Sequence, residues 1–467
     1  MILKNKISEW IDAHESDLIR DTARLVAIRS VKGDPAPGAP FGEGPKMALD
    51  EALAICAGYG FAVREYGGCV GTADLNGLSP KLDILGHLDV VGEGEGWDTD
   101  PYTAEVKDGC LYGRGTDDDK GPVAAALLAM RCVKDLGVPL KYNTRLIMGT
   151  DEESGSGDLP HYYSREKAAP HTFTPDSGFP VYNTEKGGYK PKFRIDWEPE
   201  TALPRVTAFE GGFRINVIPG DARATVAGLD SAALSTLSAS AAKKWGVTLT
   251  AADIPGGTEI AVSGRQAHAA TPWDGINGIT ALLEALAALP LADCPSTRAI
   301  RSLSALLPHR DWLGKALGIA QCDELSGELT VSFTLLTINE TGLRGQFDGR
   351  VPLCAGEENC RQIAEARFSE AGFSIAGAMS PPHHTPAESE FVQTLLSSYE
   401  AFTGTKGECR HTGGGTYVHD IEGGVAFGVC MPGFETYLHG ANERMSIKDT
   451  LTAAKIFALA IAELCGA

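Results

Sequence analysis

The chain has 467 residues, of which 43% are hydrophobic and 22% charged, and its formal net charge is −20. This length exceeds what one hydrophobic core organises, so two or three domains are expected. The composition is that of an ordinary globular protein and excludes a disordered or fibrous chain. The negative charge repels nucleic acid phosphates and anionic lipid, so we expect neither a nucleic acid nor a membrane as partner.

The eleven cysteines are odd in number and scattered, and they contain no C-x-x-C pair. This usage favours reduced thiols. Residues 1–20 mix acidic and basic with apolar residues and lack the continuous apolar core of a signal peptide. No stretch is long enough to cross a membrane. We therefore expect a cytoplasmic location.

The first part of the chain alternates predicted helices and strands. Apolar residues three and four apart predict a surface helix from Ile7 to Ile28. Residues 82–91 and 144–150 are short apolar runs typical of strands buried in a parallel sheet, and residues 121–136 between them predict a helix. The alternation predicts a mostly parallel sheet flanked by helices, whose ligands bind at the carboxyl ends of the strands.

Between about Asn183 and Met379 the pattern changes to strands, long loops and two alanine-rich helices, which predicts an inserted α+β domain. After Pro381 the α/β pattern returns, with helices from Glu390 to Phe402 and after Ser446. We therefore predict a discontinuous catalytic domain formed by two segments, with a second domain inserted between them. The predicted boundaries are residues 1–182 and 381–467 for the catalytic domain and residues 183–380 for the insertion.

The inserted segment contains an internal repeat. Asp221-Ala-Arg223 precedes a helical stretch and Gly246-Val-Thr-Leu249, and Asp348-Gly-Arg350 likewise precedes one and Gly372-Phe-Ser-Ile375. This repetition predicts that two related strand-helix-strand units build the inserted domain.

Four motifs rich in carboxylates stand where predicted strands end. They are Gly86-His87-Leu88-Asp89, Gly115-Thr-Asp-Asp118-Asp-Lys-Gly121, Thr150-Asp-Glu152-Glu153-Ser154 and Thr174-Pro-Asp176-Ser-Gly178. Such loops converge at one crevice. Crowded carboxylates repel each other and raise each other's pKa, so the cluster needs cations to stay ionised. Imidazole and carboxylate ligands without thiolate suit zinc, manganese or cobalt, and the ligand count predicts two ions.

The spacing within these motifs suggests separate roles. The i, i+2 spacing of His87 and Asp89 puts both on one side of an extended segment, so Asp89 can orient the imidazole. Adjacent Glu152 and Glu153 point in different directions, so one can bind metal while the other acts as a general base. As the alternative, Asp118 and the next aspartate could simply cap the following helix. The combination at strand ends favours the metal site.

Together with His439-Gly, this series resembles the aminoacylase/carboxypeptidase-related dinuclear zinc peptidases, and most closely the PepV-type dipeptidases. The resemblance spans nearly the whole chain and implies two Zn²⁺ ions, with Mn²⁺ or Co²⁺ as alternatives. Asp118 would bridge the two metals and Glu152 would be the catalytic base. The remaining ligands implied are His87 and Asp176 for one metal, and Glu153 and His439 for the other.

The resemblance extends to the inserted domain, which corresponds to the lid of these enzymes. His268 is similar to a lid histidine that reaches the oxyanion of the tetrahedral intermediate. Asn216 and Arg350 resemble residues that hold the terminal carboxylate of a dipeptide. The glycine-rich loop that faces this carboxylate would be formed by Gly413, Gly414 and Gly415. A planar guanidinium and bare glycine N–H groups are suited to bind an anion, although the glycine run alone could be a flexible turn.

The function implied is hydrolysis of small peptides, namely dipeptides with a free C-terminal carboxylate. The doubled lid would stand in for the partner subunit of dimeric relatives, so we expect a monomer. Gly92-Glu-Gly-Glu-Gly-Trp97 replaces a proline that often follows His-x-Asp in such enzymes, which leaves the substrate side-chain preference open. An N-acyl amino acid deacylase acting on acetyl or succinyl groups is the main alternative. A non-catalytic metal or peptide binding protein is disfavoured because a binder needs no base such as Glu152.

Overall fold

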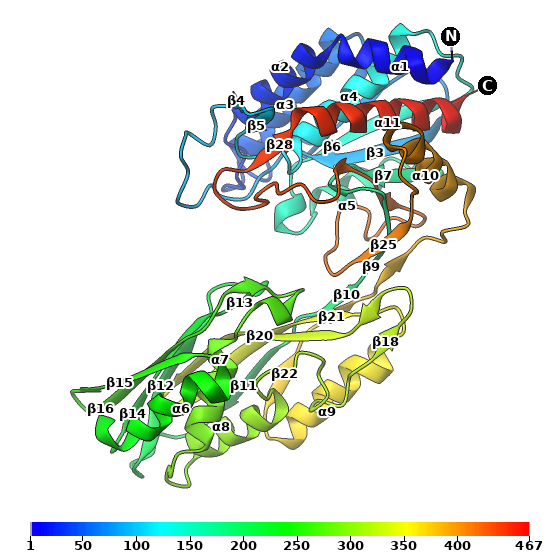
Figure 1. Ribbon diagram of the computed structural model, residues 1–467. Coiled ribbons are helices and arrows are strands. Elements are labelled where there is room, and N and C mark those ends of the chain that lie inside the picture. Colours follow the sequence, from blue (N-terminus) through cyan, green and yellow to red (C-terminus); the bar gives the residue numbers. More distant parts are fainter. Residues whose placement is uncertain (1, 467) are drawn as a thin grey trace. The chain divides into compact units, whose positions relative to one another are not determined.

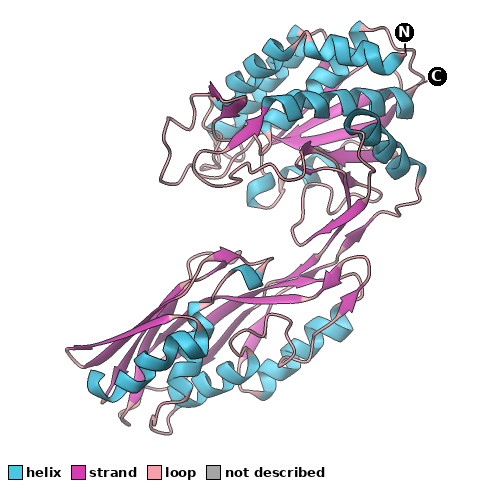
Figure 2. Cartoon of the chain, viewed as in Figure 1, coloured by secondary structure: helices cyan, strands magenta, loops and turns pink. Residues whose placement is uncertain are grey.

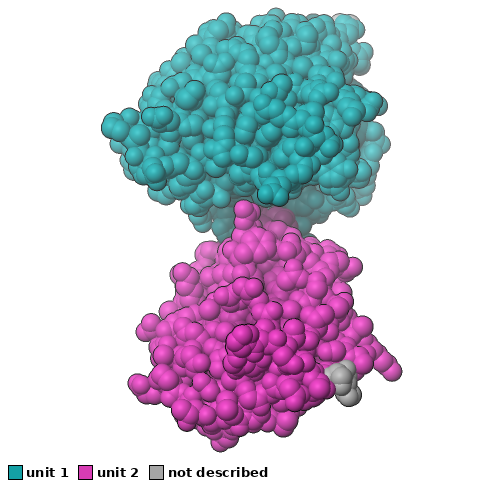
Figure 3. Space-filling model, turned by 90° about the vertical axis from the view of Figure 1, so that its left-hand side faces the viewer, with its two compact units in different colours: residues 1–184, 384–411, 415–467 teal, residues 185–383, 412–414 magenta. Residues whose placement is uncertain are grey.

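The structure, a computed structural model, describes residues 2–466 and divides into two compact units (Figure 3). Unit 1 comprises the chain up to Thr184, residues 384–411 and the chain from Gly415 onward. Unit 2 comprises residues 185–383 and 412–414. Across residues 2–466, no helix combines the length and the apolar character that crossing a membrane requires.

Residues 412–414 pack with unit 2, whereas the sequence analysis placed them in the last catalytic segment. Two hydrogen bonds explain the difference. The carbonyl of Thr412 accepts from the backbone N–H of Lys186 at 3.0 Å, and the carbonyl of Gly413 accepts from Nη1 of Arg350 at 2.8 Å. These bonds fix the short segment to the unit that supplies both donors.

Unit 1 is built around a nine-stranded sheet with the order β1-β2-β6-β3-β7-β26-β9-β24, in which β25 pairs with β9 (Figure 1). The central strands β6, β3, β7 and β26 are parallel, and antiparallel pairs lie on both sides of them. The strands are β1 Ala62–Tyr66, β2 Val70–Asp74, β3 Pro80–His87, β6 Asn143–Gly149, β7 His171–Thr174, β9 Val181–Glu185, β24 His383–His384, β25 Cys409–Thr412 and β26 Val425–Ala426. The predicted sheet flanked by helices is therefore confirmed, but the sheet is mixed, and its parallel strands are confined to the centre.

Helices cover this sheet, and α4 and α11 pack against each other with most of their side chains buried. The helices of unit 1 are α1 Leu3–Asp12, α2 Glu15–Val26, α3 Glu43–Gly58, α4 Lys120–Asp135, α5 Asp158–Tyr163, α10 Glu390–Thr403 and α11 Ile447–Cys465. The single helix predicted from Ile7 to Ile28 is wrong, because the chain breaks before α2. At the break, Nδ1 of His14 lies 2.6 Å from the carbonyl oxygen of Trp10, and the His14 backbone leaves helical geometry.

Short strands fasten the loops of unit 1 in two further small sheets. One comprises β4 Glu105–Lys107, β5 Cys110–Tyr112 and β28 Arg444–Ser446. The other pairs β8 Ser177–Gly178 with β27 Val429–Cys430 in parallel. The first sheet therefore joins the loop that precedes α4 to the chain that leads into α11.

Unit 2 contains a ten-stranded sheet with the order β15-β16-β14-β12-β20-β21-β10-β23, in which β11 pairs with β21 and β22. Figure 2 shows its helices gathered on one face of this sheet. The strands of the sheet are β10 Gly187–Tyr189, β11 Lys192–Asp196, β12 Arg205–Gly211, β14 Asp221–Ala227, β15 Thr248–Ile254, β16 Gly257–Ser263, β20 Thr330–Asn339, β21 Gly342–Val351, β22 Ser374–Ala376 and β23 Met379–Ser380. The other elements are the pairs β13 Val217–Ile218 with β17 Ala267–His268 and β18 Cys322–Asp323 with β19 Gly327–Glu328, and the helices α6 Ser235–Trp245, α7 Gly278–Ala287, α8 Pro295–Leu306 and α9 Gln362–Glu370.

The predicted repeat is confirmed by the topology of unit 2. One copy is β14-α6-β15 and the other is β21-α9-β22. In the sheet, β14 lies between β16 and β12, and β21 lies between β11 and β20. The two halves meet where β12 pairs with β20 in antiparallel fashion. The two halves of the unit 2 sheet are therefore joined edge to edge by this pair of strands.

An aromatic cluster forms part of the core of unit 1. The ring of Phe427 lies 5.6 Å from Phe173, 5.0 Å from Phe179 and 5.8 Å from Phe457 between centroids, and its side chain is fully buried. We predict that Phe427→Ala lowers the free energy of unfolding by about 3–5 kcal/mol, because the cavity cannot fully collapse. Urea denaturation measures this change.

The matched control for Phe427→Ala is Leu78→Ala, because the Leu78 side chain is 46% exposed and loses little contact. We expect the control to unfold at nearly the same urea concentration as the unmodified protein. Equal stability of the two variants would show that the aromatic cluster is not part of the core.

Candidate metal centre

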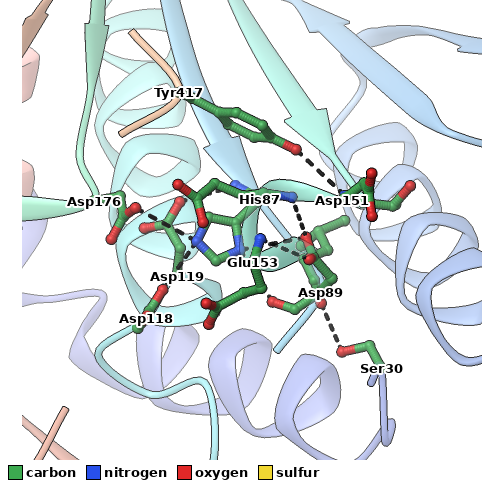
Figure 4. A network of polar contacts seen from close by, with 12 residues as sticks. Ser30, His87, Asp89, Asp118, Asp119, Asp151, Glu153, Asp176 and Tyr417 are labelled. Atoms are coloured by element: carbon green, nitrogen blue, oxygen red, sulfur yellow. Dashed lines mark hydrogen bonds and ion pairs between the residues drawn. The ribbon is translucent and has the colours of Figure 1, made fainter. Parts of the chain in front are cut away.

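The predicted ligands come together at the carboxyl edge of the unit 1 sheet. Strand β3 ends at His87, and the short 3-10 helix Glu152–Ser154 follows β6. Asp176 follows β7, Asp118 precedes α4, and His439 precedes β28. Figure 4 shows the imidazole of His87 with Asp118 and Asp176 on one side and Asp89 on the other. The strand-end geometry thus collects residues from five separate parts of unit 1.

The carboxylate of Asp118 is shared between the two histidines. Its Oδ1 lies 2.9 Å from Nε2 of His87, and its Oδ2 lies 2.8 Å from Nε2 of His439. Nε2 of His439 also lies 3.3 Å from Oε1 of Glu153, and Nε2 of His87 lies 3.5 Å from Oδ2 of Asp176. Asp118 therefore occupies the position of a bridging ligand between two groups of donor atoms.

The two groups are His87 with Glu152 and Asp176, and Asp118 with Glu153 and His439. Within each group the donor atoms all lie within 4.8 Å of one another. Glu152 and Glu153, although adjacent, thus belong to different groups. This agrees with the expectation from the sequence that the two adjacent side chains point in different directions.

Two buried atoms of the cluster have no hydrogen-bond partner, namely Nε2 of His87 and Oε1 of Glu153. Nε2 of His87 is close to the Asp118 carboxylate, but the contact lacks the angles of a hydrogen bond. Buried polar atoms without partners are rare, and here each of the two groups of donor atoms contains one. Imidazole nitrogens and carboxylate oxygens are the donors of dinuclear zinc, manganese and cobalt sites, so the residues fit two divalent cations.

The acidic side chains of the cluster raise each other's pKa. Burial raises the pKa of Glu152 well above its ordinary value, and nearby Asp176 and Asp118 add to this shift, which His87 only partly offsets. Burial followed by the charge of Asp118 also raises the pKa of Glu153 and of Asp176. The crowding of these carboxyls therefore disfavours their ionised form in the absence of cations.

Asp118 and its histidines behave in the opposite way. Burial alone would raise the pKa of Asp118, but the contacts with the imidazoles of His439 and His87 lower it. Burial alone would lower the pKa of His439, but Asp118 and Glu153 raise it to about 11. The pKa of His87 is likewise raised, because Asp118, Asp176 and Asp89 outweigh its burial. The neighbouring carboxylates therefore favour the protonated form of both imidazoles when no cation is bound.

Asp89 supports the cluster through backbone contacts. Its carboxylate accepts hydrogen bonds from the backbone N–H of Glu152 at 3.2 Å and of Glu153 at 3.1 Å. Nδ1 of His87 lies 3.0 Å from the Asp89 carbonyl oxygen and 3.5 Å from its Oδ1. The nearer partner of the imidazole is thus the Asp89 carbonyl, while the carboxylate fixes the turn that carries both glutamates.

The aspartate after Asp118 does not cap α4 with its side chain. Instead, Oδ2 of Asp119 accepts the backbone N–H of His87 at 2.9 Å. A Cβ atom on Gly86 would lie 2.5 Å from this oxygen, so glycine is needed there for the contact. The capping alternative is therefore not realised, and Asp119 anchors the end of β3.

Two contacts around the cluster were not found by sequence reasoning. The Asp158 carboxylate accepts the backbone N–H of Thr150 and the hydroxyl of Tyr417, both at 2.6 Å, and the Tyr417 ring lies edge-on to His87. Glu443 accepts backbone N–H bonds from the loop that carries Asp118. In the sequence, the position of Glu443 four residues after His439 is the one indication that Glu443 has a role near the cluster.

Glu93, in the segment Gly92–Trp97 that replaces the proline, is paired with its neighbours. Its carboxylate lies 3.1 Å from Nη2 of Arg29 and accepts the hydroxyl of Tyr102 at 2.9 Å. Its pKa is lowered by its own backbone N–H and by the hydrogen bonds from Tyr102 and Arg29, against the effect of burial. Of the two acids in the loop, Glu95 is the exposed one.

In unit 2, Arg350 is held by a buried carboxylate. Its Nε and Nη2 donate to the two oxygens of Asp348 at 2.8 Å each, and its Nη1 donates to the Gly413 carbonyl. A guanidinium has five N–H donors, so these contacts leave two for another partner. A Cβ on Gly413 would lie 3.1 Å from the Cβ of Ala270, so the glycine permits close approach.

The other predicted lid residues lie on adjoining segments of unit 2. His268 pairs with Val217 in the short β13–β17 ladder, and the carbonyl of Asn216 accepts the N–H of Ala269 at 2.9 Å. Gly414 also belongs to unit 2, whereas Gly415 belongs to unit 1. The structure thus places Asn216 and His268 on two neighbouring segments that are bonded to each other, and it brings Arg350 and Gly413 to the same region through Ala270.

We predict that loading the metal-free protein with Zn²⁺ at pH 7 releases protons, because a coordinating imidazole must be neutral and a coordinating carboxyl must be ionised. Calorimetry in two buffers of different ionisation enthalpy measures the number released. The folded pKa of His439 exceeds its ordinary 6.5, so its contribution to stability is complete below pH 6.5. That contribution is lost as the pH rises through about 11, while metal binding strengthens.

The variant His439→Asn is the control for this titration. It lacks one of the two imidazoles and should release about one proton fewer. Identical heats in both buffers for the unmodified protein would contradict a site in which protonated imidazoles become ligands.

The chain can now be compared with known proteins. Residues 84–463 match Peptidase family M20/M25/M40. YtjP of Bacillus subtilis (strain 168) is 34% identical over 457 residues, which cover 96% of this chain and 97% of that protein. A Beta-Ala-Xaa dipeptidase of Lactobacillus delbrueckii subsp. lactis is 30% identical over 462 residues, which cover 98% of this chain and 97% of that protein. The fold is similar to the crystal structure of human carnosine dipeptidase 1, with a TM-score of 0.61, 18% identity and 99% coverage of both chains. The chain therefore belongs to peptidase family M20/M25/M40.

Proposed function

We propose that this protein is a PepV-type metallo-dipeptidase that hydrolyses dipeptides with a free C-terminal carboxylate. The observation that carries the proposal is the Asp118 carboxylate, which is shared between His87 and His439 beside Glu152 and Glu153. The Beta-Ala-Xaa dipeptidase with 30% identity over nearly the whole chain supports the choice of substrate class. The proposed metals are two Zn²⁺ ions, with Mn²⁺ or Co²⁺ as alternatives.

Two bound cations would polarise the scissile carbonyl and lower the pKa of the attacking water. In this proposal Glu152 takes a proton from the water and delivers it to the leaving amine. A general base works best when its pKa lies near the operating pH, and burial raises the pKa of Glu152 in that direction. Asp89 keeps the Glu152 backbone in place through a hydrogen bond, and His268 would donate to the oxyanion.

The substrate's C-terminal carboxylate would be held in unit 2. Asp348 fixes the guanidinium of Arg350 in one orientation, and the two N–H donors that remain can meet a carboxylate. Asn216 and the backbone N–H groups of Gly413, Gly414 and Gly415 would complete this anion site. The proposed preference for two-residue peptides rests on recognition of this free carboxylate.

We further propose a monomer in the cytoplasm. The two halves of the unit 2 sheet pair with each other at β12 and β20, which supports a lid that is complete in one chain. The eleven cysteines, all within the described residues, are free thiols, which supports a reducing compartment.

We predict that the Zn²⁺-loaded protein cleaves small dipeptides faster than N-acetyl or N-succinyl amino acids, and that chelation abolishes this activity. Glu152→Gln keeps the shape of the side chain but removes the basic oxygen. It should lower kcat by at least roughly 10²- to 10⁴-fold with unchanged metal content. Amino acid release and metal analysis measure both effects.

Three other results of this experiment would contradict the proposal, each in a different way. Faster release of acetate or succinate would identify a deacylase, and full activity without metal would end the metallopeptidase proposal. Loss of metal together with activity in Glu152→Gln would make Glu152 a ligand rather than the base.

The carboxylate site makes a separate prediction. The double variant Arg350→Met with Asp348→Asn removes the guanidinium without leaving a buried carboxylate unpaired. A charge-assisted hydrogen bond contributes about 1.5–3 kcal/mol, so kcat/KM for dipeptides should fall by roughly 10- to 150-fold. Amidation of the dipeptide's C-terminus should lower kcat/KM of the unmodified enzyme by a similar factor.

The two losses should not add, because each removes the same contact. The amidated dipeptide is therefore the matched control, and the double variant should cleave it about as well as the unmodified enzyme does. Equal cleavage of free and amidated dipeptides by the unmodified enzyme would exclude the proposed carboxylate site.

A further inference from the structure

Glu443 lies between the two chain segments that carry Asp118 and His439, and its side chain is fully buried. Its Oε1 accepts the backbone N–H groups of Gly115 at 3.0 Å, Asp117 at 2.9 Å and Asp118 at 3.2 Å. Its Oε2 is bound by Nη1 of Arg114. The single carboxylate of Glu443 therefore holds the backbone of the loop that ends at Asp118.

Further bonds tie the same two segments together. Nη2 of Arg114 donates to the carbonyl of Gly440 at 3.0 Å, and the N–H of Gly113 donates to the Glu443 carbonyl at 3.0 Å. The loop can wrap around the carboxylate because Gly113 and Gly115 adopt positive φ angles of 149° and 90°. The ion pair of Arg114 and Glu443 thus spans 329 residues of sequence beside His439.

The segment that holds His439 needs such an anchor. Tyr437, His439 and Asn442 have positive φ angles of 56°, 59° and 60°, which non-glycine residues adopt at a cost. The His439 side chain is 47% exposed, in contrast to the buried His87. A ligand on a strained and exposed segment keeps its position only when neighbouring contacts determine the backbone.

We propose that Glu443 is a positioning residue of the metal centre, which sets the spacing between Asp118 and His439. It thereby determines the affinity for the cation held by Asp118, Glu153 and His439. The inference rests on the proposed metal chemistry and adds to it a residue that touches neither metal nor substrate. Partners that orient metal ligands typically contribute about 10- to 100-fold in metal affinity.

The test is Co²⁺ and Zn²⁺ titration of the metal-free variant Glu443→Gln, followed by absorption of the Co²⁺ centre and by calorimetry. The amide keeps the shape of the side chain but cannot pair with Arg114 and accept three N–H bonds together. One of the two cations should bind about 10- to 100-fold more weakly, and the Co²⁺ spectrum should change. Excess metal should restore kcat with little change in KM.

Asp83→Asn is the matched control. Asp83 is fully buried in unit 1, pairs with Arg145 through two hydrogen bonds of 3.0 and 2.9 Å, and accepts the N–H of Ala169. None of these partners belongs to the metal centre. Asp83→Asn should lower the melting temperature as Glu443→Gln does, but it should bind both cations with unchanged affinity.

A second variant, Arg114→Lys, keeps the positive charge beside Glu443 but cannot also reach the Gly440 carbonyl. This variant should lower the affinity for the same cation by a smaller factor. It keeps the proposal testable if Glu443→Gln fails to fold. Unchanged affinity in either variant, or an equal loss in Asp83→Asn, overturns the proposal. Failure of the unmodified protein to bind two cations would instead refute the metal centre itself.

Discussion

The crowding of buried negative charge at one edge of a sheet is the constraint on which the site depends. Asp118, Glu152, Glu153 and Asp176 meet there with two imidazoles, and burial makes each unpaired charge costly. Only Asp118 has its pKa lowered, because both histidines bind it, while the other three carboxyls have raised pKa values. Cations relieve this repulsion without adding volume, so the same arrangement that destabilises the empty site favours metal binding.

A second layer of carboxylates holds the first in place by binding backbone N–H groups. Asp119 binds the N–H of His87, Asp89 binds those of Glu152 and Glu153, and Glu443 binds that of Asp118. Three of the five ligand-bearing segments are therefore fixed through their main chain by a carboxylate. The ligand side chains remain free to face the cations, which is how a rigid site keeps its geometry before the metal arrives.

The sequence predicts the parts of the fold in which local pattern and tertiary structure agree. The apolar runs at β3 and β6, the repeat in unit 2 and the clustering of strand-end ligands are examples. The break at His14 escapes prediction because the apolar spacing continues across it. His439 and the lid residues could be assigned only through the family resemblance. The Tyr417–Asp158 bond, which joins residues 259 apart, leaves no trace in local spacing.

The contact of Glu443 with the loop around Asp118 also determines when, during synthesis of the chain, the candidate metal centre can form. The two residues are 325 positions apart, so at about 5–20 residues per second the ribosome needs roughly 15–65 s to supply the second after the first. Throughout that interval the Asp118 loop lacks both its anchor and His439. A nascent chain thus carries an incomplete set of candidate metal ligands until the C-terminal segment has folded against the Asp118 loop.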